Sequence, residues 1–435
     1  MEDRKRRVLT FVPAAAAVVS NMVGTGVFTT TGFMIASGAG SGDVLAAWLL
    51  GGVLALCGAL CYAEIGAHMP ESGGEYVFLT RLVHPSLGYL SGWVSIFVGF
   101  AAPIAASAMA MHLYLQTIWV WWPSRLMAAG TIVAIAGLHA FDIKKGSRFQ
   151  TFFWVLKLAM IAAFIFAVFA SDSGDGGGLT FNPGFLLSGQ FAGLLVLTSF
   201  AYSGWNAATY IGAEIVRPAK TLPYALICGT LLVTALYACL NLAYLRAVPI
   251  RELSGVPEVA NAVAARLWGP RVSAVISALI AVSLLAPISA MLMVGPRVAE
   301  AMARDGYLPA TLSVLNRRHV PSRAVWLLAG LAAAIALTST FSTLLIYIGF
   351  TLNIFAAITV FGIFPLRRSA NHRFRICVGY PVTPLLFIAF SIWTTVWAIR
   401  SEPVAALAGA VSLAIGIVSY VLRVTTFYNL RESRE

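Results

Sequence analysis

The chain has 435 residues, of which 59% are hydrophobic and only 11% are charged. A soluble domain carries about a quarter charged residues, so most of this chain must face lipid or other apolar helices. Its apolar stretches lack the alternation of a membrane barrel, and lipid cannot satisfy the open backbone groups of other structures. We therefore expect an all-α protein embedded in a lipid bilayer.

About twelve apolar stretches have the length, roughly 20 residues, that a membrane-spanning helix needs. The expected spans are 8–36, 43–69, 86–117, 125–140, 150–170, 190–216, 222–246, 270–300, 323–339, 341–364, 380–400 and 404–426. An even number of spans puts both termini on one side of the membrane. The longer loop 247–269 is expected to hold a short helix.

The net charge of +12 raises the question of a nucleic-acid partner, but the positions of the basic residues argue against one. Of the 29 basic residues, 22 fall in one set of loops, six fall in the opposite set, and Lys157 lies within a span. This bias puts both termini in the cytoplasm. The basic loops then face an anionic leaflet, which accounts for the charge without nucleic acid. The location expected is a bacterial inner membrane.

Two expected spans are interrupted near their middle. The first contains Gly24–Gly26 (Gly-Thr-Gly), and the sixth contains Ser203–Gly204. Small residues also allow close helix packing, so the first motif alone is ambiguous. Breaks at matching positions of two halves favour a binding site near the membrane midplane. There, free N–H groups attract a carboxylate and free carbonyls attract an ammonium, which suits an amino acid.

At these residues the sequence resembles the amino acid–polyamine–organocation permease superfamily, nearest its L-type amino acid transporter branch. Gly24–Phe28 (Gly-Thr-Gly-Val-Phe) is similar to the family's Gly-Ser-Gly-Ile-Phe, and Phe200–Asn206 to its Phe-Ala-Tyr-Gly-Gly-Trp-Asn. Three loops also match family motifs: Pro70–Tyr76, Glu214–Pro223 and Ala303–Pro309. The five motifs follow the family's order, whereas spans eleven and twelve carry no motif.

The resemblance implies a LeuT-type fold, in which two inverted repeats of five helices precede two further helices. The first repeat would be residues 1–170 and the second 171–364, followed by spans eleven and twelve with a cytoplasmic C-terminus in 365–435. The family implies a secondary active transporter, a permease or an exchanger, that works by alternating access. No accessory chain or oligomeric state is implied.

The resemblance also implies the site residues. The substrate carboxylate would meet Gly24, Thr25 and Gly26, and Thr25 keeps the hydroxyl of the family's serine. The amino group would meet backbone carbonyls near Val23, Phe200, Ala201 and Ser203, with Asn206 beside them and with Phe200 and Trp205 as gates. Span eight departs from the family's glycine- and serine-rich version.

Lys157 stands alone in an apolar segment of the fifth span, where a lysine is costly unless it is paired or hydrated. It lies about seven residues, roughly 10 Å, inside the expected cytoplasmic end. Snorkelling to that surface is therefore one interpretation. The resemblance implies another: the ammonium takes the place of a sodium ion in sodium-coupled relatives. It would then bridge helices one and eight, with Ser283 or Ser289 as its partner.

The acidic residues inside the expected spans lie toward the span ends: Asp43, Glu64, Glu214 and Glu300. A cationic ligand needs a carboxylate in the pocket, because buried charges require pairing. The resemblance adds that Asn206 stands where an arginine-handling branch carries an acid. These points favour neutral L-amino acids, and Lys157 in the place of a sodium ion favours a sodium-independent transporter. The alternatives kept open are a cationic amino acid, a polyamine or a nucleobase on the same fold.

Other classes of function find little support. A membrane-embedded enzyme would need metal-ligand spacing, paired aspartates or a nucleophile motif. The six histidines show no such spacing, so we expect no catalytic residue, no metal and no cofactor. A channel would need rings of charge or repeated filter loops, which the sequence lacks. The five cysteines are expected to be packing residues.

Overall fold

The computed structural model describes residue 7 and residues 9–119, 121, 124–141, 143–171, 177–186, 188–318, 320–369 and 373–432. Within these ranges the side chains of residues 143–151, 405 and 424–432 are not described. Part of the charge argument therefore lies outside the described residues or side chains, namely Arg4, Lys5, Arg6, Lys144, Lys145, Arg148, Arg431 and Arg434.

The described chain is helical apart from turns, loops and one isolated bridge between Leu9 and Ile215. The longer helices are α2 (Phe11–Met22), α3 (Gly26–Ala36), α4 (Ser41–His68), α6 (Pro85–Val94), α7 (Ala102–Gln116), α8 (Ser124–Phe141), α9 (Ile143–Ala170), α11 (Gly189–Tyr202), α12 (Pro218–Ala247), α14 (Val259–Ser283), α15 (Leu285–Val294), α16 (Pro296–Arg304), α17 (Ser322–Thr338), α18 (Phe341–Phe361), α20 (Val382–Ser401) and α21 (Pro403–Glu432). The shorter elements are α5 (Glu75–Leu82), α10 (Pro183–Leu186), α13 (Ile250–Leu253), α19 (Ile363–Arg368), the π-helical η1 (Ser95–Ala101), and the 3₁₀ segments η2 (Ala207–Glu214) and η3 (Ala310–Leu312).

The predicted all-α membrane architecture of about twelve spans is confirmed. In the described part of the chain, ten helical segments are long and apolar enough to cross a membrane. The other two expected spans are α17, which has 17 residues, and the sixth span, which is divided into α11 and η2. The loop 247–269 holds α13 and the first part of α14, as expected.

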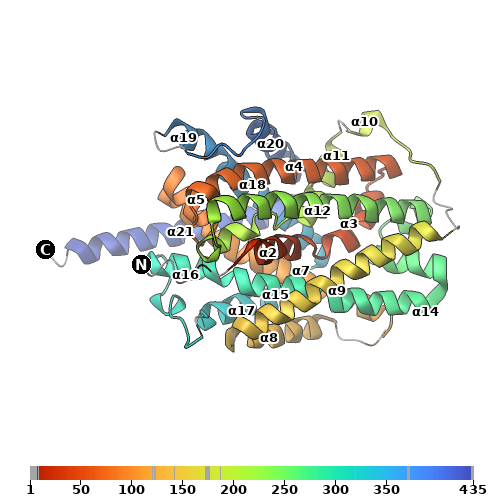
Figure 1. Cartoon of the computed structure of the whole chain (residues 1–435), viewed down its shortest axis with the longest axis horizontal. Helices are drawn as coiled ribbons and strands as arrows, with labels where there is room; N and C mark the ends of the chain where they lie inside the picture. The colour runs from red at the N-terminus through yellow and green to blue at the C-terminus, as the bar shows by residue number, and fades with distance from the viewer. Residues whose placement is uncertain are drawn as a thin grey trace.

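The long helices run side by side along the longest axis of the molecule, and both chain termini lie at the same end (Figure 1). The short helices α5 and α19 and the helix α16 lie toward that end too (Figure 1). These elements adjoin the loops that hold most of the basic residues and that are expected on the cytoplasmic side. The shared end of the termini agrees with an even number of spans.

The broken first span lies inside the bundle, as do the third and eighth spans. About two thirds of the first and eighth spans are buried, and 78% of the third, against 11% of the last span. The apolar residues of α21 are therefore exposed on the outside, where a membrane protein contacts lipid. Core positions near the first break, such as Val18, Met22 and Val23, are fully enclosed.

The short helix α5 was not predicted. After α4 the chain reverses at Gly73 and Gly74, whose φ angles of +125° and +56° favour glycine. A Cβ atom at Gly74 would lie 2.6 Å from the Tyr210 ring, so the turn packs directly against the sixth span. The helix α5 starts at the next residue, Glu75, and buries this residue's side chain in the bundle.

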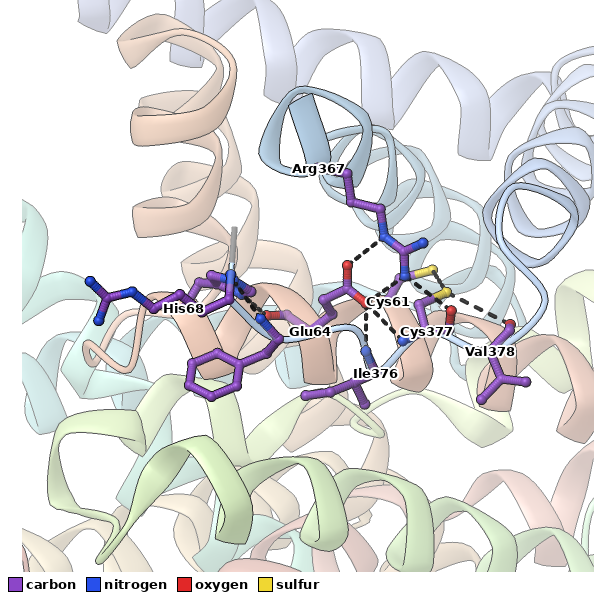
Figure 2. A network of polar contacts seen from close by, with 9 residues as sticks. Cys61, Glu64, His68, Arg367, Ile376, Cys377 and Val378 are labelled. Carbon is purple, nitrogen blue, oxygen red and sulfur yellow. Dashed lines mark hydrogen bonds and ion pairs between the residues drawn. The ribbon is translucent and has the colours of Figure 1, made fainter. Parts of the chain in front are cut away.

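The end of the second span is anchored to the connection between spans ten and eleven (Figure 2). The Glu64 carboxylate accepts two hydrogen bonds from the Arg367 guanidinium, at 2.6 and 2.7 Å. It also accepts the backbone N–H groups of Ile376 and Cys377. The Sγ atoms of Cys61 and Cys377 lie 3.5 Å apart beside this network. Glu64 is thus fully enclosed yet well paired.

Candidate functional site

The first span breaks between α2 and α3. Val23 leaves the helical conformation with φ −74° and ψ 78°, and α3 restarts at Gly26. The N-terminus of α3 has no side-chain cap among the described contacts. Uncapped N–H groups and the helix dipole favour a negative charge at this point. The break therefore offers the carboxylate site that the Gly-Thr-Gly motif predicts.

The sixth span breaks at the matching place. The helix α11 ends at Tyr202, the turn passes through Gly204 with φ +96°, and η2 continues as a 3₁₀ helix from Ala207. The predicted interruption of both spans is confirmed. Asn206 ends the turn at the start of η2.

The two breaks pack against each other. A Cβ atom at Gly26 would lie 2.5 Å from the Cα atom of Ala201. A Cβ atom at Gly204 would lie 2.8 Å from the Cβ atom of Asn21. Both glycines are therefore needed for close packing. Gly24 differs, because the nearest heavy atom to a Cβ there is the Met22 carbonyl oxygen at 3.8 Å.

Protein donors already bind most of the carbonyls expected to meet a substrate ammonium. The Tyr237 hydroxyl of α12 lies 2.6 Å from the carbonyl oxygen of Met22 and 3.2 Å from that of Ala201. The Phe200 carbonyl accepts the N–H of Ser203. The Met22 carbonyl also accepts the N–H of Gly24, so both of its lone pairs are used. No sequence motif pointed to Tyr237, whose hydroxyl contacts a carbonyl oxygen at each of the two breaks.

The side chain of Lys157 is fully buried, and its ammonium donates to the carbonyl oxygen of Val23. The helix α9 begins at Ile143, earlier than expected, so Lys157 lies near the middle of 28 residues. Burial and this hydrogen bond argue against snorkelling. The predicted partners on span eight bond elsewhere: Ser289 pairs with His139 at 2.7 Å, and Ser283 donates to the Ile280 carbonyl.

A small cavity of about 50 Å³ lies beside the sixth break. Of the predicted site residues, Ser203, Trp205 and Asn206 line this cavity, whereas Val23, Gly24, Thr25, Gly26, Phe200 and Ala201 do not. The first span contributes Asn21, and the tenth span contributes Asn353. The cavity and the N-terminus of α3 are therefore neighbouring but separate parts of the region around the breaks.

The gate residues lie on either side of the sixth break. Phe200 is buried in the last turn of α11. Trp205 packs edge-on against Tyr62 of α4 and Phe387 of α20, with ring centres 4.7 and 6.0 Å apart. Trp205 thus contacts helices outside the broken pair. A gating role for either residue stays a prediction.

One conclusion from the sequence was wrong: an acidic residue does line this cavity. Glu75 comes from α5, outside the spans that the prediction searched for carboxylates. Its Oε1 atom accepts hydrogen bonds from the Tyr62 hydroxyl at 2.6 Å and from Asn206 Nδ2 at 2.9 Å. Burial raises the pKa of Glu75 to about 7, although these hydrogen bonds act to lower it. The sequence feature that could have indicated this residue was the Gly-Gly pair before Glu75, which is typical of a tight turn.

Comparisons with known proteins agree with this architecture. A family model described as amino acid permease matches residues 9–422. The Asc-type amino acid transporter 1 of Mus musculus is 28% identical and covers 96% of this chain and 81% of its own. The large neutral amino acids transporter small subunit 2 of Rattus norvegicus is 29% identical with the same coverage. The serine/threonine exchanger SteT of Bacillus subtilis (strain 168) is 31% identical and covers 87% of this chain and 88% of its own. The predicted resemblance is thereby confirmed, and the chain belongs to the amino acid permease family.

Proposed function

We propose that the protein is a sodium-independent exchanger or permease of neutral L-amino acids that works by alternating access. Family membership supports amino acid transport. The names of three relatives refer to large neutral amino acids, to serine and threonine, and to Asc-type transport, which supports neutral substrates. We assign the protein no enzymatic reaction.

The substrate carboxylate is proposed to bind at the uncapped N-terminus of α3, beside Gly24 and Thr25. The ammonium group is proposed to bind near the carbonyls of Phe200, Ala201 and Ser203, with Asn206 nearby. The open space at Gly24 supports this position, because it lets a ligand approach the backbone. Phe200 and Trp205 are proposed as gates.

The observation that carries the proposal of sodium independence is the Lys157 ammonium at the Val23 carbonyl. An ammonium group at the first break supplies what a bound cation would otherwise supply. The test is amino acid uptake into proteoliposomes in sodium and in choline buffers. Equal uptake is expected, and strict sodium dependence would contradict the proposal.

We further propose a bacterial inner membrane, which the similarity to the Bacillus subtilis exchanger supports. Both termini are proposed to lie in the cytoplasm, because 22 of the 29 basic residues fall in one set of loops. The division into repeats at 1–170 and 171–364, with 365–435 after them, is supported by the matching breaks of spans one and six. Cysteine labelling of loop residues on both faces tests the orientation.

A second candidate function is transport of a cationic amino acid or a polyamine. Glu75 in the cavity favours it, because a buried carboxylate is the partner that a cationic group needs. Competition by arginine and putrescine separates this candidate from the neutral substrates. Inhibition as strong as that by serine or leucine would favour the cationic ligand.

A further inference from the structure

Four acidic residues in the described part of the chain are nearly or fully buried: Asp43, Glu64, Glu75 and Glu300. Glu64 binds Arg367, and Glu300 binds Arg297 and Arg304. Asp43 accepts the backbone N–H groups of Gly40 and Asn182. Burying a carboxylate is costly unless such partners compensate its charge.

Glu75 has no such compensation among the described groups. Its two hydrogen-bond donors are the neutral side chains of Tyr62 and Asn206, and the neutral hydroxyl of Ser91 on α6 also lies beside it. The other titratable group facing it is Tyr210, also neutral, and the packed helices α6 and α18 bring no acidic or basic side chain. The carboxyl group therefore requires a cation or a proton to balance its charge.

The geometry favours a proton. Both donors bind Oε1, so Oε2 remains available to carry a hydrogen atom while the two bonds persist. The cavity at Glu75 has a volume of about 50 Å³. One water molecule needs roughly 10–15 Å³ of cavity volume, so this cavity admits a few waters. Water can thus reach Glu75 in this conformation, in which the cavity is smaller than an amino acid.

The bond to Asn206 connects this carboxyl group to the transport machinery. Asn206 stands at the end of the break in the sixth span, and Glu75 begins α5 in the connection between spans two and three. A hydrogen bond to an ionised carboxylate is about twice as strong as one between neutral groups. Protonation of Glu75 would therefore weaken the link between α5 and the sixth span.

We propose that Glu75 is the proton-binding carboxyl group of this transporter, and that its protonation weakens the hydrogen bond from Asn206 so that η2 can move. This inference rests on the proposed amino acid transport. One proton binds Oε2 on the acidic side and leaves on the other side with the substrate. With a neutral amino acid, each cycle then moves one positive charge.

The test uses the purified full-length protein in proteoliposomes that contain a pH-sensitive dye. In the wild type, an inside-alkaline gradient should drive accumulation of a neutral amino acid, with acidification of the interior. Glu75→Gln keeps an acceptor for Tyr62 and Asn206 and resembles the protonated form. It should retain counterflow exchange but lose accumulation and acidification.

Two further variants separate a proton site from a structural role. Tyr62→Phe removes a donor that favours the charged form, so the midpoint of the pH profile should rise by about one pH unit. Glu71→Gln is the matched control in the same loop, because Glu71 is half-exposed and pairs with Arg81. This control should behave as the wild type does.

Gradient-driven accumulation in Glu75→Gln would overturn the proposal. Accumulation by the wild type without acidification of the interior would also overturn it, and would leave the transport function intact. If arginine is carried by the wild type without proton movement and is lost in Glu75→Gln, Glu75 binds substrate instead. Absence of any amino acid counterflow in the wild type would refute the proposed function itself.

Discussion

The ammonium of Lys157 donates a hydrogen bond to the carbonyl oxygen of Val23, at the residue where the first membrane helix breaks. Lys157 is fully buried, so the bond places a positive charge inside the bundle. Sodium ions in proteins also bind backbone carbonyl oxygens at unwound helices. This relationship ties the fifth span to the first.

Replacement of Lys157 should stop transport if its charge organises the break. Lys157→Ala removes both the charge and the donor to Val23. Lys157→Arg should also be impaired, because a planar guanidinium cannot reproduce a compact ammonium. Uptake by both variants in proteoliposomes, at matched protein amounts, provides the measurement. Near-normal uptake by Lys157→Ala would contradict this role.

The two glycines of the first break should respond differently to alanine. Gly26→Ala forces a Cβ atom against Ala201. The free energy of unfolding should therefore fall by about 1–3 kcal/mol, as it does when a core is overpacked. Gly24→Ala has room in the protein and should unfold at nearly the wild-type temperature. It should nevertheless weaken amino acid binding, because the added methyl group approaches the proposed carboxylate site.

Thermal shift with and without substrate measures both effects in one assay. A folded Gly24→Ala protein with wild-type affinity would place the carboxylate elsewhere. For the same reason, Gly26→Leu is a poor test of the anion site. A leucine there would collide with the sixth span, and loss of transport would not identify a ligand.

The ion pair of Glu64 with Arg367 should matter far more than an exposed pair. Glu64→Gln leaves Arg367 and two backbone N–H groups poorly compensated, and breaking a buried pair costs roughly 3–5 kcal/mol. The exposed pair of Glu71 with Arg81 contributes about 0–1 kcal/mol. Unfolding of Glu64→Gln and Glu71→Gln in detergent compares them, and equal stability would contradict this account.

Stability should also report the buried carboxyl group of Glu75. Its pKa is raised from 4.5 to about 7 in the folded protein, so the folded state binds more protons between these values. The free energy of unfolding should therefore fall as pH rises from about 4.5 to 7. Glu75→Gln should lack this part of the decrease. The difference between the two unfolding curves across this pH range is the quantity to measure, and parallel curves would count against a buried titrating group.

Much of the fold could be predicted, because spans one and six are recognisable by their apolar length and by their paired breaks. Gly24–Gly26 and Ser203–Gly204 are local signals, since small residues allow unwinding where a β-branched run would not. The site could be predicted only in part. Glu75 and Tyr237 reach the breaks through the packing of α5 and α12, and no local pattern reports such distant contacts.

Lys157 illustrates the same limit. A lysine in an apolar span is energetically costly, so the sequence identifies Lys157 as unusual. Whether it snorkels or is buried depends on where α9 begins. The boundary of a helix is set by tertiary contacts as well as by composition. Likewise, the pairing of Ser289 with His139 depends on how α15 and α8 pack.

The central claim is that this permease carries neutral amino acids through the region between the two breaks. Counterflow in proteoliposomes loaded with an unlabelled neutral amino acid tests it most directly. The account predicts trans-stimulated uptake of the labelled amino acid that serine, threonine or leucine inhibits and that arginine, lysine and putrescine do not. Tightest competition by arginine, or no trans-stimulated uptake of any neutral amino acid, would contradict it.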